Sequence, residues 1–299
     1  MIRILWTQKQ DDGPVQRAYP ATAYDSGRGR TVLYGGGGSG GALGDTWEWD
    51  GANWTQMADS GPPPRFQSVM AYDAQRSQTV LFSGSNGVPD TWAWDGNNWT
   101  QLADSGPPPR LVSAMSYDST QQRTLLFGGE EEGGSSRTND TWSWDGTAWT
   151  QLAETGPPPR CAHSMAYDSG RNRTVLFGGL GISATLGDTW EWDGTVWTQI
   201  SSFGAQPCAY AALAFKADSV ALFGGASGIV TSGNPGATSF YGITWTWDGQ
   251  HWTLRQDFGP APRFGHSMCY DSKRACLVMY GGATSANASV ADTWEHSEG

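Results

Sequence analysis

The sequence has few of the features that mark secreted, membrane-spanning or nucleic-acid-binding proteins. Only four of its 299 residues are cysteine, and none stands in CxxC spacing, which is typical of a reducing compartment. Lysine and arginine number 18 against 29 acidic residues, so the formal net charge is -11 and a phosphate-binding surface is not expected. The chain has no apolar run of about 18 residues and no basic start followed by an apolar core. We therefore expect a cytoplasmic protein whose partners include neither nucleic acid nor membrane.

Helical periodicity is absent as well, and a repeated string stands in its place. "WTQ" occurs at residues 6–8, 54–56, 99–101, 149–151 and 197–199, with "WTL" at 252–254. Aligning the copies on the arginine of "PPPR" gives six units spaced by 45 to 55 residues. Their anchor positions are Arg17, Arg65, Arg110, Arg160, Cys208 and Arg263.

Each unit reads as four short strands. The fourth begins "RCAHSMAYDSGRNRTVLFGG" at 160–179, where two apolar, β-branched and aromatic runs are typical of strands. After a variable loop it continues "DTWEWDGTVWTQI" at 188–200, in which Asp-Gly predicts a hairpin turn. The sequence therefore predicts an all-β chain.

Paired glycines followed by a loop and a tryptophan identify a family resemblance. The pairs stand at residues 128–129, 178–179, 224–225 and 281–282, and over nearly its whole length the chain resembles kelch-repeat β-propellers, including the galactose oxidase-like ones. This implies one six-bladed propeller spanning residues 1–299. The expected blades are residues 17–64, 65–109, 110–159, 160–207, 208–262, and 263–299 completed by the strand at 1–8.

The first "WTQ" has a role in that ring. The stretch from Arg263 onward supplies three strands of a blade but no following "WTQ". We expect the N-terminal strand to complete blade six, because an open ring would leave edge strands with unpaired backbone groups.

Positions counted from the anchor predict how the first strand of each blade is used. Positions five and seven are large, as in Met165 and Tyr167, and are expected to pack between blades. Positions four and six are small, as in Ser164 and Ala166, and are expected to face the channel. Positions one and two vary between units and should lie at the channel mouth, beside the variable loops that follow the double glycines.

We place the functional site at that mouth, because unrepeated residues on a repeated scaffold are free to serve function. The candidates are aromatic, charged and polar residues at positions one and two and in the loops, including the acidic run at 130–132. They are Tyr19, Phe66, Gln67, Leu111, Glu130, Arg137, Cys161, Tyr210, Phe240, Tyr241 and Phe264.

Several residues have a structural interpretation beside the functional one. Repeated anchor arginines are expected to bond to neighbouring loops, and His163 and His266 to be structural. Cys161 near His163 could be a nucleophile, but a plain buried thiol is favoured. Blade five departs from the template at Cys208, at 215–216, at 243 and in its long loop, which favours functional divergence over drift.

Two classes of function remain open. The first is binding, without cofactor or metal, of a small apolar or sugar-like molecule or a peptide at the mouth. The second is a metal-independent isomerase, epimerase or cyclase, as the resemblance to propellers of the sialic acid epimerase type allows. The resemblance to galactose oxidase would imply a copper site of two tyrosines and two histidines, which Tyr19, Tyr210, His163 and His266 do not convincingly provide. The ExxxDxxxH pattern of iron-dependent specifier proteins is absent.

Overall fold

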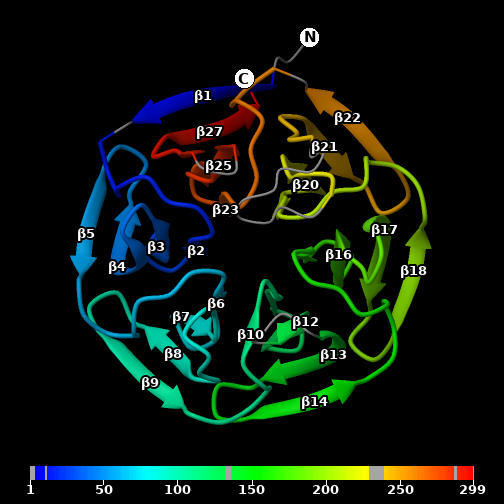
Figure 1. Cartoon of the computed structure of the whole chain (residues 1–299), viewed down its shortest axis with the longest axis horizontal. Coiled ribbons are helices and arrows are strands. Elements are labelled where there is room, and N and C mark those ends of the chain that lie inside the picture. Colours follow the sequence, from blue (N-terminus) through cyan, green and yellow to red (C-terminus); the bar gives the residue numbers. More distant parts are fainter. Residues whose placement is uncertain are drawn as a thin grey trace.

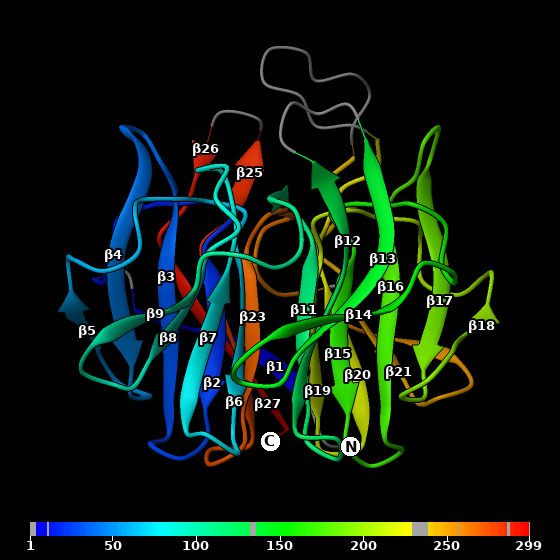
Figure 2. The ribbon, with the colours of Figure 1, turned by 90° about the horizontal axis from the view of Figure 1, so that it is seen from below.

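Six antiparallel sheets stand as blades around a central axis (Figure 1). The computed structural model describes residues 4–10, 12–131, 136–228, 239–256, 258–285 and 288–298. Seen from the side, the strands nearest the axis run along it (Figure 2). The prediction of an all-β, six-bladed kelch propeller is confirmed. In the part of the chain that the structure describes, no helix is long and apolar enough to cross a membrane.

The strands of the first three blades follow the repeat boundaries. Blade one contains β2 (Ala21–Asp25), β3 (Arg30–Gly38), β4 (Gly41–Trp49) and β5 (Trp54–Ala58). Blade two contains β6 (Val69–Asp73), β7 (Gln78–Phe82), β8 (Thr91–Trp94) and β9 (Trp99–Ala103). Blade three contains β10 (Arg110–Leu111), β11 (Ala114–Asp118), β12 (Arg123–Glu131), β13 (Arg137–Trp144) and β14 (Trp149–Ala153).

The other three blades repeat this arrangement. Blade four contains β15 (Ser164–Asp168), β16 (Arg173–Leu180), β17 (Thr185–Trp192) and β18 (Trp197–Ser201). Blade five contains β19 (Ala212–Lys216), β20 (Ser219–Phe223), β21 (Thr244–Trp247) and β22 (Trp252–Gln256). Blade six contains β23 (Ser267–Asp271), β24 (Cys276–Tyr280), β27 (Thr293–Glu298) and β1 (Ile4–Gln10), and β25 (Ala283–Ser285) pairs with β26 (Ala288–Ser289) beside it.

The N-terminal strand closes the ring as predicted. β1 pairs antiparallel with β27, with Trp6 opposite His296, and the two chain ends lie near one another (Figure 1). Trp6 is buried against Phe223 of blade five, and its Nε1 donates to Thr244 Oγ1 at 2.9 Å. The "WTQ" at residues 6–8 is therefore the outer strand of blade six.

The same tryptophan contact joins every pair of neighbouring blades. The tryptophan of each outer strand donates its Nε1–H to a buried threonine of the preceding blade. This threonine is that of the "DTW" segment, or its equivalent in blade five. The other pairs are Trp54 with Thr293, Trp99 with Thr46, Trp149 with Thr91, Trp197 with Thr141 and Trp252 with Thr189. Each outer strand is thus fixed to the blade before it.

A second kind of contact between blades, a trio of arginine, glutamate and tryptophan, is present at three of the six junctions. In blade one, Arg28 bonds Glu48 through both guanidinium Nη atoms, and Glu48 also accepts from Trp94 of blade two at 2.8 Å. Equivalent trios are Arg171, Glu191 and Trp247, and Arg274, Glu295 and Trp49.

Blades two, three and five have Ala93, Ser143 and Thr246 in place of this glutamate. In the blades that follow two and three, Trp144 and Trp192 have buried Nε1 atoms with no hydrogen-bond partner among the described residues. Because an unsatisfied buried donor costs about 1–3 kcal/mol, we expect these two junctions to be weaker than the three that contain a complete trio.

The anchor arginines bond within their own blades. Arg160 is fully buried, and its two Nη atoms bond both carboxylate oxygens of Asp188 at 2.7 and 2.8 Å, while Nη1 also donates to the Gly178 carbonyl. Burial alone would raise the pKa of Asp188, but hydrogen bonds from Arg160 and Trp190 and the arginine charge lower it overall. The other pairs are Arg17 with Asp45, Arg65 with Asp90, Arg110 with Asp140 and Arg263 with Asp292.

Blade five replaces this pair as a unit. Cys208 takes the place of the arginine and Ile243 that of the aspartate, so neither charge is left buried alone. The tryptophan that elsewhere bonds the aspartate, here Trp245, donates to Gln206 at 3.1 Å instead. These exchanges compensate one another, so the departure of blade five from the template has a structural explanation at these positions.

The predicted division of the first strands into a channel face and a packing face is not observed. Each first strand presents its edge to the axis, so both of its faces meet a neighbouring blade. Ala21 and Ala23 of blade one pack against Met70 of blade two, whereas Met70 and Tyr72 also line the channel. Small and large residues therefore share both roles.

Candidate functional site

The position-two residues form a closed circle of backbone hydrogen bonds around the axis. Each amide donates to the carbonyl of the position-two residue in the preceding blade, at 2.6 to 3.3 Å. We call this circle the collar; it consists of Tyr19, Gln67, Val112, Ala162, Tyr210 and Gly265. Since every member donates once and accepts once, the collar holds the six blades at a fixed distance from the axis.

The collar has an unusual backbone conformation. All six residues lie in the left-handed region, with φ between 46° and 61°. Glycine adopts this conformation without strain and occupies it in blade six as Gly265, but any other residue costs roughly 1–2 kcal/mol. Val112 is a particular outlier because its side chain is β-branched. Five blades thus keep a side chain where glycine would be less strained.

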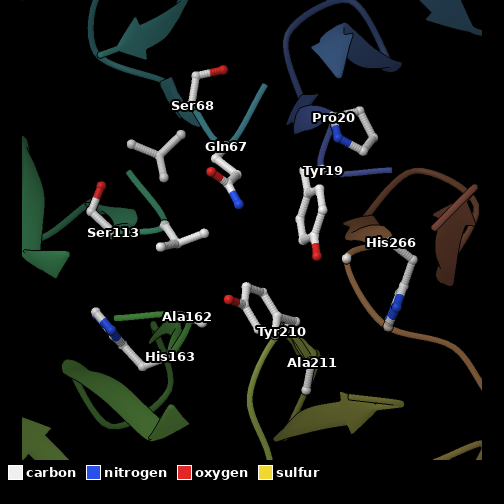
Figure 3. A pocket seen from close by; sticks show the side chains of 13 residues that line it. Tyr19, Pro20, Gln67, Ser68, Ser113, Ala162, His163, Tyr210, Ala211 and His266 are labelled. Atoms are coloured by element: carbon white, nitrogen blue, oxygen red, sulfur yellow. The ribbon is translucent and has the colours of Figure 1, made fainter. Parts of the chain in front are cut away.

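Side chains of the collar point into a cavity on the axis. Figure 3 shows Tyr19, Gln67 and Tyr210 directed toward its centre. The cavity has a volume of about 120 Å³ and is lined by residues at positions two and three of every blade, together with Val69. The rings of Tyr19 and Tyr210 meet edge to face, with centroids 5.5 Å apart.

Three polar groups in this cavity have no hydrogen-bond partner among the residues that the structure describes. Among the described residues, none is hydrogen bonded to the Tyr19 hydroxyl, the Tyr210 hydroxyl or the Gln67 side-chain amide. Burial raises the pKa of both tyrosines, and the charge of Glu130 contributes further at Tyr210, so both hydroxyls stay protonated. The cavity therefore offers neutral donors and acceptors against aromatic walls.

Glu130, Arg137 and Cys161 form a charged cluster beside Tyr210. Glu130 and Arg137 face one another across β12 and β13, with Arg137 Nε 3.8 Å from Glu130 Oε2. The Cys161 thiol donates to Glu130 Oε2 at 3.3 Å, and Arg137 donates to the Gly181 carbonyl of blade four. Burial and the bond to Glu130 raise the pKa of Cys161 to about 12, which favours a plain buried thiol over a thiolate nucleophile.

The two candidate histidines are held between blades. His163 lies between Gly128 and Gly179: a Cβ on either glycine would come within 3.1 Å of its imidazole Cε1 or 2.8 Å of its own Cβ. His266 has the same relation to Gly224 and Gly282. Figure 3 shows both rings turned away from the centre.

Both histidines are neutral at physiological pH. Burial, and next the charge of the anchor arginine Arg160 or Arg263, lowers the pKa of each to about 3. The double glycines of the repeat thus make room for a packed imidazole. Within the described ranges, no group of three or more His, Cys, Asp or Glu side chains could hold a metal ion.

The predicted aromatic set is only partly assembled. Phe264 packs against both collar tyrosines and stacks on Phe240, with centroids 4.9 Å apart and planes 21° from parallel. Phe264 is only 2% exposed, so it supports the tyrosines rather than reaching the mouth. Tyr241 lies elsewhere, packed on the core between blades four and five.

The remaining candidates surround the collar. Phe66 is half-buried over Gly37 of blade one, and Leu111 pairs with Glu130 in the short ladder of β10 and β12. Of the acidic run at 130–132, residue 132 lies outside the described residues, as do 229–238 of the long blade-five loop.

Position three was missed as a source of cavity residues. Ser68 and Ser113 line the collar cavity, as do the histidines, and the buried Ser68 hydroxyl has no hydrogen-bond partner in the described part of the chain. Position three also varies between units, with four residue types in six blades, so the same comparison of repeats could have found it. The left-handed backbone carries no such signal, because glycine marks it in only one unit.

Comparisons with known proteins agree with this architecture. Residues 90–247 match the family model described as the KLHDC2/KLHL20/DRC7 Kelch-repeats domain. No curated protein matches the sequence significantly. A solved structure titled "Structure of YjhT" superimposes with a TM-score of 0.73 at 16% identity, covering 94% of this chain and 95% of that one, which shows a shared fold. With over half of its length matched by the family model and the repeat present in all six blades, the chain belongs to the kelch-repeat family.

Proposed function

We propose that the collar binds a small, uncharged, hydroxyl-bearing molecule of the sugar-like kind. One observation carries the proposal: five blades keep a strained, non-glycine residue in the collar, and three of those side chains direct unpaired polar groups at the axis. Strained backbone is retained where the surroundings or the function require it. Gly265 supports the functional reason, because blade six closes the circle without any side chain.

The chemistry of the cavity favours such a ligand. A tyrosine hydroxyl can donate and accept, and a glutamine amide does both, so Tyr19, Gln67 and Tyr210 together match a group of neutral hydroxyls. The tyrosine rings supply apolar surface of the kind that packs on a sugar ring. No charged side chain lines the collar cavity among the described residues.

The volume of the cavity limits how much of the ligand can enter it. Ligand sites usually enclose about 300–1,000 Å³, so a cavity of about 120 Å³ admits one substituent of the ligand. The rest of the molecule would lie over the collar, within reach of Glu130 and Arg137, whose side chains are 25% and 18% exposed.

Binding of neutral monosaccharides and sugar alcohols tests the proposal. We expect at least one member of such a panel to bind with one-to-one stoichiometry by calorimetry. Tyr19→Phe and Tyr210→Phe remove only a hydroxyl, and each should weaken binding about five-fold, as the loss of one neutral hydrogen bond of about 1 kcal/mol predicts. Tyr72→Phe, at the other end of the channel, is the matched control and should change nothing.

Two results would overturn this function. One is the absence of binding by every sugar and sugar alcohol tested. The other is equal affinity in wild type and the two collar variants. Binding of a peptide that ignores both hydroxyls would show that the mouth is a peptide site instead.

A further inference from the structure

A second cavity occupies the opposite end of the channel. Its volume is about 330 Å³, and it is formed by the first strands of all six blades, which stand nearest the axis (Figure 1). Position five supplies its inner wall, with Thr22 in blade one and apolar side chains in the other five. These are Met70, Met115, Met165, Leu213 and Met268. We call this space the lower cavity.

The outer wall of the lower cavity is aromatic. Position seven is phenylalanine, Phe215, in blade five and tyrosine in the other five blades. The described hydroxyl contacts point to the turns of neighbouring blades: Tyr24 accepts from the Lys273 amide at 3.3 Å, Tyr117 from the Gln75 amide at 3.2 Å, and Tyr167 donates to Thr120 at 2.6 Å. The rings therefore turn their apolar parts toward the channel.

Charge is absent from this wall. None of the described residues that line the lower cavity is acidic or basic. The nearby position-eight carboxylates bond to turn amides and arginines instead, as Asp168 does with the Gly170 and Arg171 amides and the Arg171 guanidinium. A charged ligand would lose its hydration here without gaining a partner, which excludes charged ligands.

The methionines suit an apolar occupant of variable shape. Each is 7 to 8% exposed, and methionine adapts its unbranched, polarizable side chain to irregular partners, aromatic ones included. A volume of about 330 Å³ is within the range of small-molecule sites. Because six strands encircle the space, a folded protein surface cannot enter it.

We propose that the lower cavity is a second binding site, which takes a small, uncharged, apolar molecule, aromatic or alicyclic. The lower cavity is lined by positions five, six and seven of each blade, whereas the collar cavity is lined mainly by positions two and three, so the two sites share no residue. Binding is driven by burial of apolar surface of the ligand against the methionine and aromatic side chains.

Fluorescence of the neutral probe N-phenyl-1-naphthylamine tests this site. We expect saturable, one-to-one enhancement with the wild-type protein. The double variant Met165→Thr and Met268→Thr should fold, since threonine already occupies this position in blade one. It removes two apolar side chains from the wall and should therefore weaken probe binding about ten-fold or more. Thr22→Met completes the apolar wall and should strengthen binding about three-fold.

The controls separate this proposal from the collar. Tyr210→Phe should leave probe affinity unchanged, and sugars should not displace the probe. Circular dichroism confirms that each variant is folded. Absence of saturable binding to the wild type would overturn the proposal, and so would a folded double threonine variant that binds the probe as well as wild type.

Discussion

Replacing Ala93 by glutamate is expected to stabilise the propeller. The new carboxylate would stand where Glu48 stands in blade one, between Arg76 of its own blade and the unpaired Trp144 Nε1 of the next. Arg76 already bonds Asp73 at 2.7 Å, as Arg28 bonds Asp25 in blade one. The change therefore completes a trio of which two members are in place.

The magnitude follows from the complete trio. Glu48 is 4% exposed and accepts three hydrogen bonds of 2.7 to 2.9 Å, and a hydrogen bond to a charged group contributes about 1.5–3 kcal/mol. Burying the carboxylate offsets part of this gain. We expect a net increase of about 1–2 kcal/mol in the free energy of unfolding, measured by urea denaturation at pH 7 with tryptophan fluorescence.

Blade three supplies a matched control. Ser143→Glu places the same carboxylate beside the unpaired Trp192, but Gln121 stands there instead of arginine. Without the cation, the desolvation cost is not repaid by charge, so this variant should gain less or lose stability. If Ala93→Glu destabilises the protein, or if the two variants behave alike, the trio does not contribute as argued.

Three further predictions follow from contacts described above. Trp6→Ala should lower the free energy of unfolding by about 3–5 kcal/mol, because it leaves a cavity at the closing blade; a melting temperature equal to wild type would contradict closure by β1. His163→Ser combined with His266→Ser should flatten the acid side of the stability profile. Each histidine has a pKa lowered from 6.5 to about 3 by burial and by a neighbouring arginine, so stability is full above pH 6.5 and falls by about 1.4 kcal/mol per histidine per pH unit below it; urea unfolding between pH 6.5 and 4.5 measures the slope, and an unchanged slope would refute the assignment. Gly265→Ala should destabilise by roughly 1–2 kcal/mol, since φ is +61° and the new Cβ would lie 2.6 Å from the blade-one collar tyrosine; Gly40→Ala, which meets nothing within 4 Å, is the control in the same thermal assay.

The architecture was predictable because the sequence repeats, so that strands recognised in one copy could be assigned at the same positions in the others. The spacing of the anchors gave the blade count, and the lone "WTQ" at 6–8 showed which strand closes the ring. Side-chain direction was harder, because alternation says only that Met165 and Ala166 point to opposite faces, not which face meets the axis. The strand in fact lies with its edge toward the axis, so residues from both of its faces line the channel.

The candidate site was predictable in place but not in form. Comparing the units placed Tyr19, Gln67 and Tyr210 at the channel mouth, and all three line the cavity on the axis. The collar itself could not be inferred, because valine and tyrosine disfavour a left-handed backbone and tertiary hydrogen bonds impose it. Tyr241 was misplaced because it precedes Gly242 in a loop whose path the repeat does not define.

The pairing of β1 with β27 also affects the order of events during synthesis. β1 is made before the other strands of the propeller, yet its partner β27 is made after all of them, with about 290 residues between Trp6 and His296. Bringing such distant segments together costs about 5 kcal/mol of chain entropy. Blades one to five can pair internally as they emerge, whereas the last junction waits for the whole sequence. Until then the nascent protein carries an unmatched strand edge, and we expect this stage to need protection from aggregation most.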